Sequence, residues 1–161
     1  MMDATKITDI IYLGSAADAI NTQWLSSNNI TLVISFMTMS ELAEYGMNKD
    51  FYTNKNIIWC HFDIDDTDSA PISLYFHLYE YIASYTKLNK NILIHCHHGI
   101  SRSSTVLAAY MMQDMMWTRR EAIEYIAKRR PIICPNDGFM DKLKELEITL
   151  LHNRSLDEND E

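Results

Sequence analysis

The sequence contains little glycine, proline or cysteine, and each shortage limits the class of protein that it encodes. Four glycines and three prolines among 161 residues leave few breaks, so we expect most of the chain to lie in helices and strands. The three cysteines, Cys60, Cys96 and Cys134, form no evenly spaced framework, which favours free thiols in a reducing compartment over a disulfide scaffold. Hydrophobic residues make up 47% of the chain, which is enough to bury the core of a folded domain.

Positive charge and long apolar runs are also scarce. The chain has 14 Lys and Arg residues against 22 Asp and Glu residues, which gives a formal net charge of -8 and disfavours a general nucleic-acid binder. No run of about 18 residues is apolar throughout, and the first residues lack the basic and apolar segments of a signal peptide. We therefore expect a protein without a membrane span, located in the cytoplasm, the nucleus or both. Nothing in the composition indicates the oligomeric state.

The spacing of apolar residues predicts an α/β domain. Four segments have the β-branched runs or the period-two alternation of strands: residues 10–13, 30–36, 57–64 and 92–94. Four others have helical spacing: residues 72–82, 106–111, 122–127 and 139–150. Strands that alternate with helices predict a mostly parallel sheet covered on both faces. We expect one domain over residues 1–154, followed by an acidic, disordered tail over residues 155–161.

One segment combines a strand, a polar turn and the start of a helix. In residues 92–104, Cys96 follows the apolar run, Gly99 lies in the turn and Arg102 lies where the helical pattern begins. Successive backbone N–H groups of a turn that leads into a helix form a cradle for a tetrahedral oxyanion, and the Arg102 fork can bind two oxygens of one phosphate. A thiol in that field loses its proton readily. We therefore favour a nucleophilic thiolate at Cys96 over a buried hydrophobic side chain.

This loop resembles that of the cysteine-based protein phosphatases, and within them the dual-specificity phosphatases. The family pattern His-Cys-x-x-Gly-x-x-Arg-Ser is matched from His95 to Ser103. Further similarity lies in residues 7–15, in Tyr75-Phe76 and in residues 129–140, so that the resemblance covers about residues 7–150. It implies a central, mostly parallel sheet of about five strands flanked by helices on both faces. It also implies hydrolysis of phosphotyrosine and phosphoserine or phosphothreonine in protein substrates through a phosphocysteine, with no metal or other cofactor.

The resemblance implies a role for each residue of the loop. Cys96 is the expected nucleophile, and Ser103 is expected to assist departure of its thiolate. The expected substrate-binding residues are His97, His98, Gly99, Ile100, Ser101 and Arg102. His95 is expected to orient the loop, and Asn136 to support the site, to cap the last helix, or both.

The acidic stretch after the fourth strand segment contains the candidates for the general acid that protonates the leaving oxygen. Family spacing places this acid nine residues before Tyr75, at Asp66, and leaves Asp65 as the alternative. We expect the other aspartates of the stretch, including Asp63 and Asp68, to lie in a solvated turn.

Two positions depart from the family pattern. His98 stands where Ala is usual, as in RNA 5′-triphosphatases, so an RNA phosphatase is an alternative; the acidic total charge and the Ser103-Ser104 pair stand against it. Cys134 stands where Ser is more common, and it is either structural or a disulfide partner of oxidised Cys96. An inactive phosphate-binding module is a third alternative, although such modules usually lose the nucleophile or the arginine.

One concentration of basic residues lies outside the loop. It comprises Arg119, Arg120, Lys128, Arg129 and Arg130. We expect these side chains to lie on solvated helix faces, and the alternative is contact with an acidic partner or a second phosphate.

Overall fold

A five-stranded sheet forms the centre of the computed structural model, which describes residues 4–67 and 70–160. Its strands are β1 (Thr5–Lys6), β2 (Ile11–Gly14), β3 (Ile30–Phe36), β4 (Ile58–Phe62) and β5 (Asn91–His95). Their order is β1-β2-β5-β3-β4; β1 pairs antiparallel with β2, and the pairs β2–β5, β5–β3 and β3–β4 are parallel. The mostly parallel sheet expected from the sequence is confirmed.

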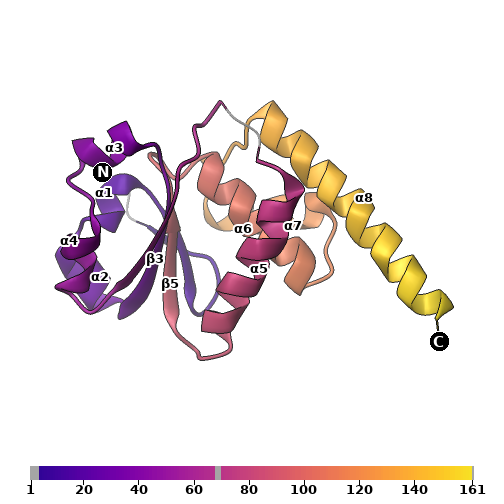
Figure 1. Ribbon diagram of the computed structural model, residues 1–161, viewed down its shortest axis with the longest axis horizontal. Helices are drawn as coiled ribbons and strands as arrows, with labels where there is room; N and C mark the ends of the chain where they lie inside the picture. Colours follow the sequence, from indigo (N-terminus) through magenta and orange to yellow (C-terminus); the bar gives the residue numbers. More distant parts are fainter. Residues whose placement is uncertain (1–3, 68–69, 161) are drawn as a thin grey trace.

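Helices cover both faces of this sheet, as expected (Figure 1). One face carries α1 (Ala16–Ala19), α2 (Thr22–Ser27), α3 (Met39–Glu44) and α4 (Lys49–Thr53). The other carries α5 (Ile72–Thr86), α6 (Arg102–Asp114), α7 (Arg119–Arg129) and α8 (Asp137–Asn159). Helix α6 packs against α5, α7 and α8 and is the centre of this second layer.

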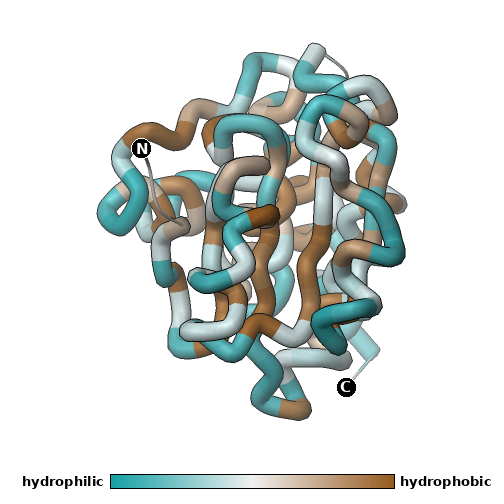
Figure 2. Tube along the Cα trace, turned by 90° about the vertical axis from the view of Figure 1, so that its left-hand side faces the viewer, coloured by the Kyte–Doolittle hydropathy of each residue, from teal (hydrophilic) through white to brown (hydrophobic). Residues whose placement is uncertain are grey.

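Side chains of the central strands alternate between two apolar cores. In β3, Leu32 and Ile34 pack into the core under α5 to α8, whereas Val33 packs into the core under α1 to α4. Strands buried on both faces are apolar throughout, which explains the continuous run of residues 30–36. In Figure 2 the tube is brown along the central strands and teal along much of the outer chain.

The sequence predicted the long helices better than the short ones. Thr118 and Glu121 form a capping box at the start of α7, and this helix ends at Arg129, with Pro131 two residues later. Helices α1 to α4 have between four and six residues each, too short to show an apolar period, and the sequence analysis missed them.

Helix α8 is longer than expected. It continues to Asn159, so the part of the expected disordered tail that the structure describes is helical in residues 155–159. Within this end of the helix, Ser155 Oγ donates to the His152 carbonyl and Asn159 Nδ2 donates to the Ser155 carbonyl. In Figure 1 this end of α8 projects away from the sheet. Among residues 4–67 and 70–160, no helix combines the length and apolar character needed to cross a bilayer.

The parallel strands direct three connections to one edge of the sheet. Strands β3, β4 and β5 end at Phe36, Phe62 and His95, and they are followed by α3, by the acidic loop and by the cysteine loop. In open α/β sheets, ligands bind beyond the carboxyl ends of such strands. The candidate site therefore lies at this edge.

Candidate active site

The loop between β5 and α6 turns sharply at Gly99. Gly99 has a φ of 68°, and a Cβ atom at this position would lie 2.5 Å from the Gly14 carbonyl oxygen and 2.6 Å from Arg130 Nη2. Both the backbone conformation and the close approach of β2 therefore require glycine. This confirms the expected turn at this position.

The loop carbonyls from Cys96 to Ser101 all accept hydrogen bonds from the surrounding scaffold. The Cys96 carbonyl accepts from His95 Nδ1 at 3.0 Å, the His97 carbonyl from Ala16 N at 3.0 Å and the His98 carbonyl from Arg130 Nη2 at 3.4 Å. The Gly99 carbonyl accepts from Arg130 Nε at 2.9 Å, the Ile100 carbonyl from Cys134 N at 2.8 Å and the Ser101 carbonyl from Thr105 N at 3.0 Å. In a planar trans peptide the N–H points away from the C=O. The amides that follow these carbonyls therefore point to the opposite side, as a phosphate cradle requires.

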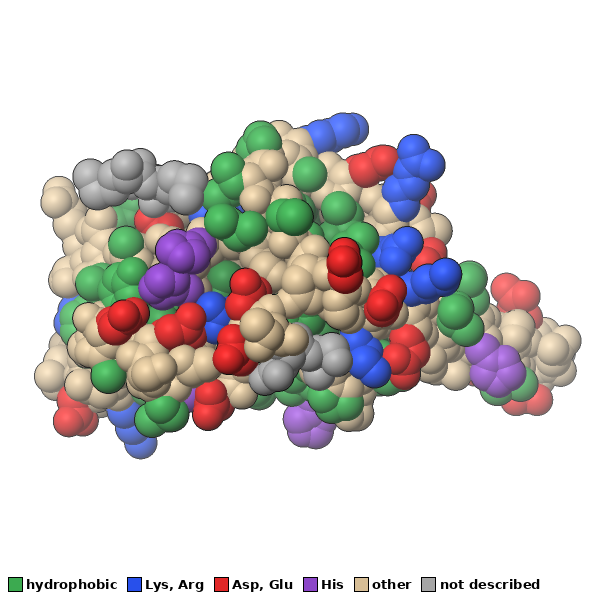
Figure 3. Space-filling view, turned by 90° about the horizontal axis from the view of Figure 1, so that it is seen from above, with side chains coloured by type: hydrophobic (Ala, Val, Ile, Leu, Met, Phe, Trp, Pro, Cys, Tyr) green, Lys and Arg blue, Asp and Glu red, His purple; other side chains and the backbone are tan. Residues whose placement is uncertain are grey.

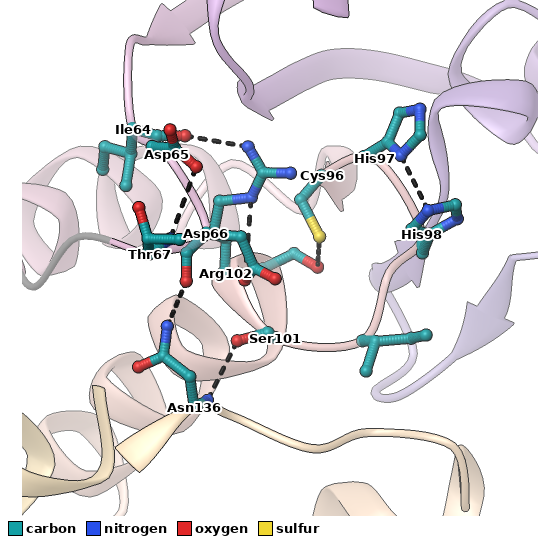
Figure 4. Close-up of polar contacts among 12 residues, drawn as sticks. Ile64, Asp65, Asp66, Thr67, Cys96, His97, His98, Ser101, Arg102 and Asn136 are labelled. Carbon is teal, nitrogen blue, oxygen red and sulfur yellow. Dashed lines mark hydrogen bonds and ion pairs between the residues drawn. The ribbon is translucent and has the colours of Figure 1, made fainter. Parts of the chain in front are cut away.

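Cys96 lies at the base of this cradle, 2% exposed, where β5 ends. Its Sγ lies 3.1 Å from Ser103 Oγ, at the start of α6 (Figure 4). The N-terminus of α6 places positive partial charge beside the sulfur, and the Ser103 hydroxyl can donate to it. Cys96 and Ser103 are thus brought together as the sequence predicted.

Arg102 is buried beside Cys96, and Glu41 of α3 holds its outer end. Nη1 and Nη2 of Arg102 donate to the two carboxylate oxygens of Glu41 at 2.7 and 2.9 Å, and Nη1 also donates to the Ile64 carbonyl at 2.8 Å. Nε is buried with no hydrogen-bond partner among the described residues. The Nε–H and the remaining Nη2–H form a side-on fork for two phosphate oxygens.

Glu41 is a residue of the site that the sequence analysis missed. It forms a capping box with Thr38 at the start of α3, and this local pattern could have located the helix. Its contact with Arg102 joins positions 61 residues apart, which no local pattern encodes. The hydrogen bond from Arg102 is the main cause that lowers the pKa of Glu41 to about 2, so Glu41 is a carboxylate at neutral pH.

Two candidates for the acid, Asp65 and Asp66, lie on the loop after β4 and differ in their contacts (Figure 4). Asp66 Oδ1 lies 4.0 Å from Arg102 Nε, whereas Asp65 Oδ1 accepts a hydrogen bond from the Thr67 N–H at 3.3 Å. Asp66 thus faces the arginine of the cradle, and Asp65 caps a local turn. Asp68, in the same acidic stretch, lies outside the described residues.

Asn136 links the acidic loop to the cysteine loop. Its Nδ2 donates to the Asp66 carbonyl, and its backbone N–H donates to Ser101 Oγ at 3.0 Å. Its Oδ1 accepts from the Phe139 N–H at 2.8 Å, which caps α8. Asn136 therefore makes both of the contacts considered for it, the helix cap and the support of the loops.

Comparison with known proteins identifies the family. The family model described as "Dual specificity phosphatase, catalytic domain" matches residues 11–149. The chain belongs to this family. Tyrosine-protein phosphatase vhp-1 of Caenorhabditis elegans is 34% identical over 96% of this chain and 23% of its own length. Human dual specificity protein phosphatase 5 is 31% identical over 91% of this chain and 36% of its own length. Among solved structures, DUSP15 is 30% identical, with a TM-score of 0.77 over 90% of this chain and 87% of that chain.

The coverage of these relatives is unequal. The dual-specificity phosphatase domain described here spans about a quarter to a third of the two curated relatives, but most of the DUSP15 chain. What it shares with the curated relatives is therefore the catalytic domain.

His95 anchors the cysteine loop of this phosphatase domain through a buried chain of hydrogen bonds. Trp59 Nε1 donates to Ser35 Oγ at 2.8 Å, Ser35 Oγ lies 2.5 Å from His95 Nε2, and His95 Nδ1 donates to the Cys96 carbonyl. The Cys96 carbonyl can only accept, so Nδ1 carries a proton, and in the neutral imidazole Nε2 accepts from the Ser35 hydroxyl. Burial agrees with it, because desolvation lowers the pKa of His95 to about 4. The geometry fits the loop-orienting role expected of His95.

His97 and His98 form a pair at the rim of the phosphatase cradle. Their rings are joined by a contact of 2.8 Å between His97 Nδ1 and His98 Nε2, and His97 Nε2 also lies 3.7 Å from Glu44 of α3. Figure 3 shows purple histidine side chains with red acidic side chains close to them on this face. Among the described residues, no three His, Cys, Asp or Glu side chains come together as a metal site.

Cys134 of the phosphatase domain is exposed, and Cys96 is buried. The Cys134 N–H donates to the Ile100 carbonyl, so the Cys134 backbone adjoins the cysteine loop. Its redox role stays a prediction.

Proposed function

We propose that this domain hydrolyses phosphotyrosine and phosphoserine or phosphothreonine in proteins through a phosphocysteine intermediate. The observation that carries the proposal is the cradle itself. A cysteine sulfur lies beside a helix N-terminus, the loop amides face inward, and an arginine keeps its side-on fork unused. Such a constellation suits a phosphate monoester and an attack by sulfur along the line of the leaving group.

In the first step, the Cys96 thiolate attacks phosphorus and forms the S–P bond while the P–O bond to the substrate breaks. Arg102 and the loop amides hold the equatorial oxygens, whose charge is stabilised by donors already in place. Asp66 gives its proton to the leaving oxygen, so that an alcohol or phenol departs rather than an alkoxide.

In the second step, a water molecule attacks the phosphocysteine. Asp66, now a carboxylate, takes a proton from this water; the O–P bond forms and the S–P bond breaks. The Ser103 hydroxyl stabilises the departing thiolate by donating a hydrogen bond to it, and the contact of 3.1 Å supports this role. Inorganic phosphate and the original thiolate result.

The choice of protein substrates is supported by the matched family and by the names of its relatives, which describe tyrosine and dual-specificity protein phosphatases. An RNA substrate remains a second candidate because of His98, which is exposed at the rim. The net charge of -8 disfavours it.

The test is phosphate release by wild type and Cys96→Ser from matched phosphotyrosine and phosphothreonine peptides, para-nitrophenyl phosphate and triphosphate-ended RNA. We expect turnover of both peptides, lost in Cys96→Ser. Phosphate release from RNA alone would show that the substrate is RNA rather than protein. No release from any substrate would indicate a phosphate-binding module. Equal turnover by Cys96→Ser would refute the covalent mechanism.

Asp66→Asn and Asp65→Asn separate the two acid candidates. We expect Asp66→Asn to lower kcat about 100-fold for phosphothreonine, whose alkoxide needs a proton, and much less for para-nitrophenyl phosphate. Asp65→Asn should lower neither. The reverse result would assign the acid to Asp65.

A further inference from the structure

Arg130 and Arg129 are adjacent in sequence but lie in different environments. Arg129 is exposed, and its guanidinium stacks on the Tyr125 ring at 3.5 Å. Arg130 is 3% exposed and lies under the cysteine loop. The expectation that all five clustered basic residues lie on solvated faces is therefore wrong for Arg130. The chain leaves the helix here, because Pro131 disfavours helical backbone at the preceding residue.

Arg130 contacts two successive carbonyls of the loop. Its Nε donates to the Gly99 carbonyl at 2.9 Å and its Nη2 to the His98 carbonyl at 3.4 Å, while Nη1 donates to Thr5 Oγ1 at 3.0 Å. Trans peptide geometry then points the N–H groups of Gly99 and Ile100 to the other side, toward the cradle. A Cβ at Gly99 would lie only 2.6 Å from Nη2, so the loop and the guanidinium fit closely.

A buried arginine is costly unless hydrogen bonds and charges compensate it. Burial lowers the pKa of Arg130, and the charges of Asp18 and Cys96 oppose this effect. Arg130 and Cys96 therefore interact electrostatically across the loop. An apolar side chain of similar volume would fill this site but would leave the His98 and Gly99 carbonyls without their donor, so the guanidinium supports the loop as well as the packing.

We propose that Arg130 is a positioning residue of the phosphate cradle. Its fork orients the Gly99 and Ile100 amides toward phosphate, and its charge, from beneath the loop, stabilises the Cys96 thiolate together with Arg102. The inference rests on the proposed function in naming phosphate as the ligand of the cradle. A lysine in its place keeps the charge but not the planar fork, so the two effects are separable.

Other charged or titratable groups also lie around the cysteine loop. They are Arg102 of α6, Asp66 of the acidic loop, His95 of β5, His97 and His98 of the loop itself, and Glu41 and Glu44 of α3. All of them are retained in the variants below, so a change in ionisation reports on Arg130.

The test compares Arg130→Met, Arg130→Lys and, as the matched control, Arg129→Met. The rate of Cys96 alkylation by iodoacetamide is measured against pH, with mass spectrometry of the Cys96 peptide to separate it from Cys60 and Cys134. Binding of inorganic phosphate and the melting temperature are measured on the same samples. Neither the alkylation nor the binding readout requires turnover.

For Arg130→Met we expect the alkylation midpoint to move to higher pH by about half a unit or more, and phosphate to bind about tenfold or more weakly. Arg130→Lys should keep the midpoint near that of wild type while phosphate binding weakens about tenfold. Arg129→Met should change neither.

A lower melting temperature of Arg130→Met with an unchanged alkylation profile and unchanged phosphate binding would show a merely structural role. If Arg130→Met does not fold, the test rests on Arg130→Lys. Phosphate binding by Arg130→Lys that is as tight as that of wild type would overturn the inference. Turnover of para-nitrophenyl phosphate by wild type is measured separately. If wild type shows no turnover while the Arg130 variants change the alkylation profile and phosphate binding as expected, the proposed function is refuted and the role of Arg130 still holds.

Discussion

At the scale of single residues, Glu41 and His95 do the most to fix the atoms around Cys96. Glu41 occupies the end-on fork of Arg102 and leaves the side-on fork for phosphate. His95 fixes the Cys96 carbonyl from within the sheet. Both are held in one protonation state at neutral pH, Glu41 by Arg102 and His95 by burial.

Glu41→Gln tests whether the charge of Glu41 positions Arg102. Glutamine also serves in a capping box, so α3 should stay capped while Arg102 loses its charged partner. Charge-assisted hydrogen bonds contribute about 1.5 to 3 kcal/mol, so we expect kcat/KM for para-nitrophenyl phosphate to fall at least about tenfold. Glu121→Gln, in the equivalent capping box of α7, is the control and should leave kcat/KM unchanged. Equal kinetics in the two variants would contradict the role of Glu41.

His95 makes the stability of the fold sensitive to acid. Its pKa in the folded state, about 4, lies below its usual value of 6.5, so the unfolded chain takes up the proton first as the pH falls. The contribution of His95 to the free energy of unfolding should therefore be greatest above pH 6.5. It should fall between pH 6.5 and 4, by at most about 1.4 kcal/mol per pH unit. Urea unfolding of wild type and His95→Asn across this range measures it. Parallel pH dependence of the two proteins would show that another group is responsible.

At the scale of elements, the site is an assembly of three connections and a helix start. The acidic loop and the cysteine loop meet through Asn136, which is also the N-cap of α8. Helix α8 is thereby tied to the catalytic edge of the sheet, and its cap and its contact with the acidic loop can be separated by substitution.

Asn136→Ser should keep the cap of α8 and lose the amide donor to the Asp66 carbonyl. Serine is as good an N-cap as asparagine, so we expect little change in melting temperature but a lower kcat for phosphothreonine peptides. Thr118→Ala, at the N-cap of α7, should do the opposite: about 1 kcal/mol less stability, or about 2 to 4 °C, at unchanged kcat. A wild-type kcat in Asn136→Ser would show that the loop holds Asp66 without Asn136.

The sequence predicted those parts of the molecule that have a local pattern. The parallel strands and the turn at Gly99 follow from runs and spacings within a few residues, and the place of Ser103 beside Cys96 was implied by the resemblance of the loop to the phosphatase family. The partners of the site that it missed lie far away in sequence: Glu41 is 61 residues from Arg102, and Arg130 is 31 residues from Gly99. A charged side chain looks alike in sequence whether it is solvated or buried. Only the packing of α3 and α7 in the folded protein decides which charged side chains face the cysteine loop.

At the scale of the whole molecule, charge is the feature that bears on the choice of substrate. The net charge is -8, and Glu41 neutralises the one arginine in the cradle. The exposed acidic side chains of Glu44 and Asp65 lie close to the same cradle. Figure 3 shows red acidic side chains gathered on the face that is seen from above. A phosphopeptide must therefore bring its flanking residues into a negative field.

We expect this field to favour phosphosites flanked by Lys or Arg. At low ionic strength, kcat/KM for a Lys-flanked phosphotyrosine peptide should exceed that of a matched Asp-flanked peptide about fivefold, equivalent to about 1 kcal/mol. This difference in kcat/KM should disappear as the salt concentration rises from about 0.05 to about 0.5 M, because the shorter Debye length screens the acidic side chains from the flanking residues of the peptide. Glu44→Gln should narrow the gap at low salt and leave turnover of para-nitrophenyl phosphate unchanged, since this small substrate has no flanking charge. A preference that persists unchanged in high salt would assign it to direct contacts with the peptide rather than to the field of the acidic rim.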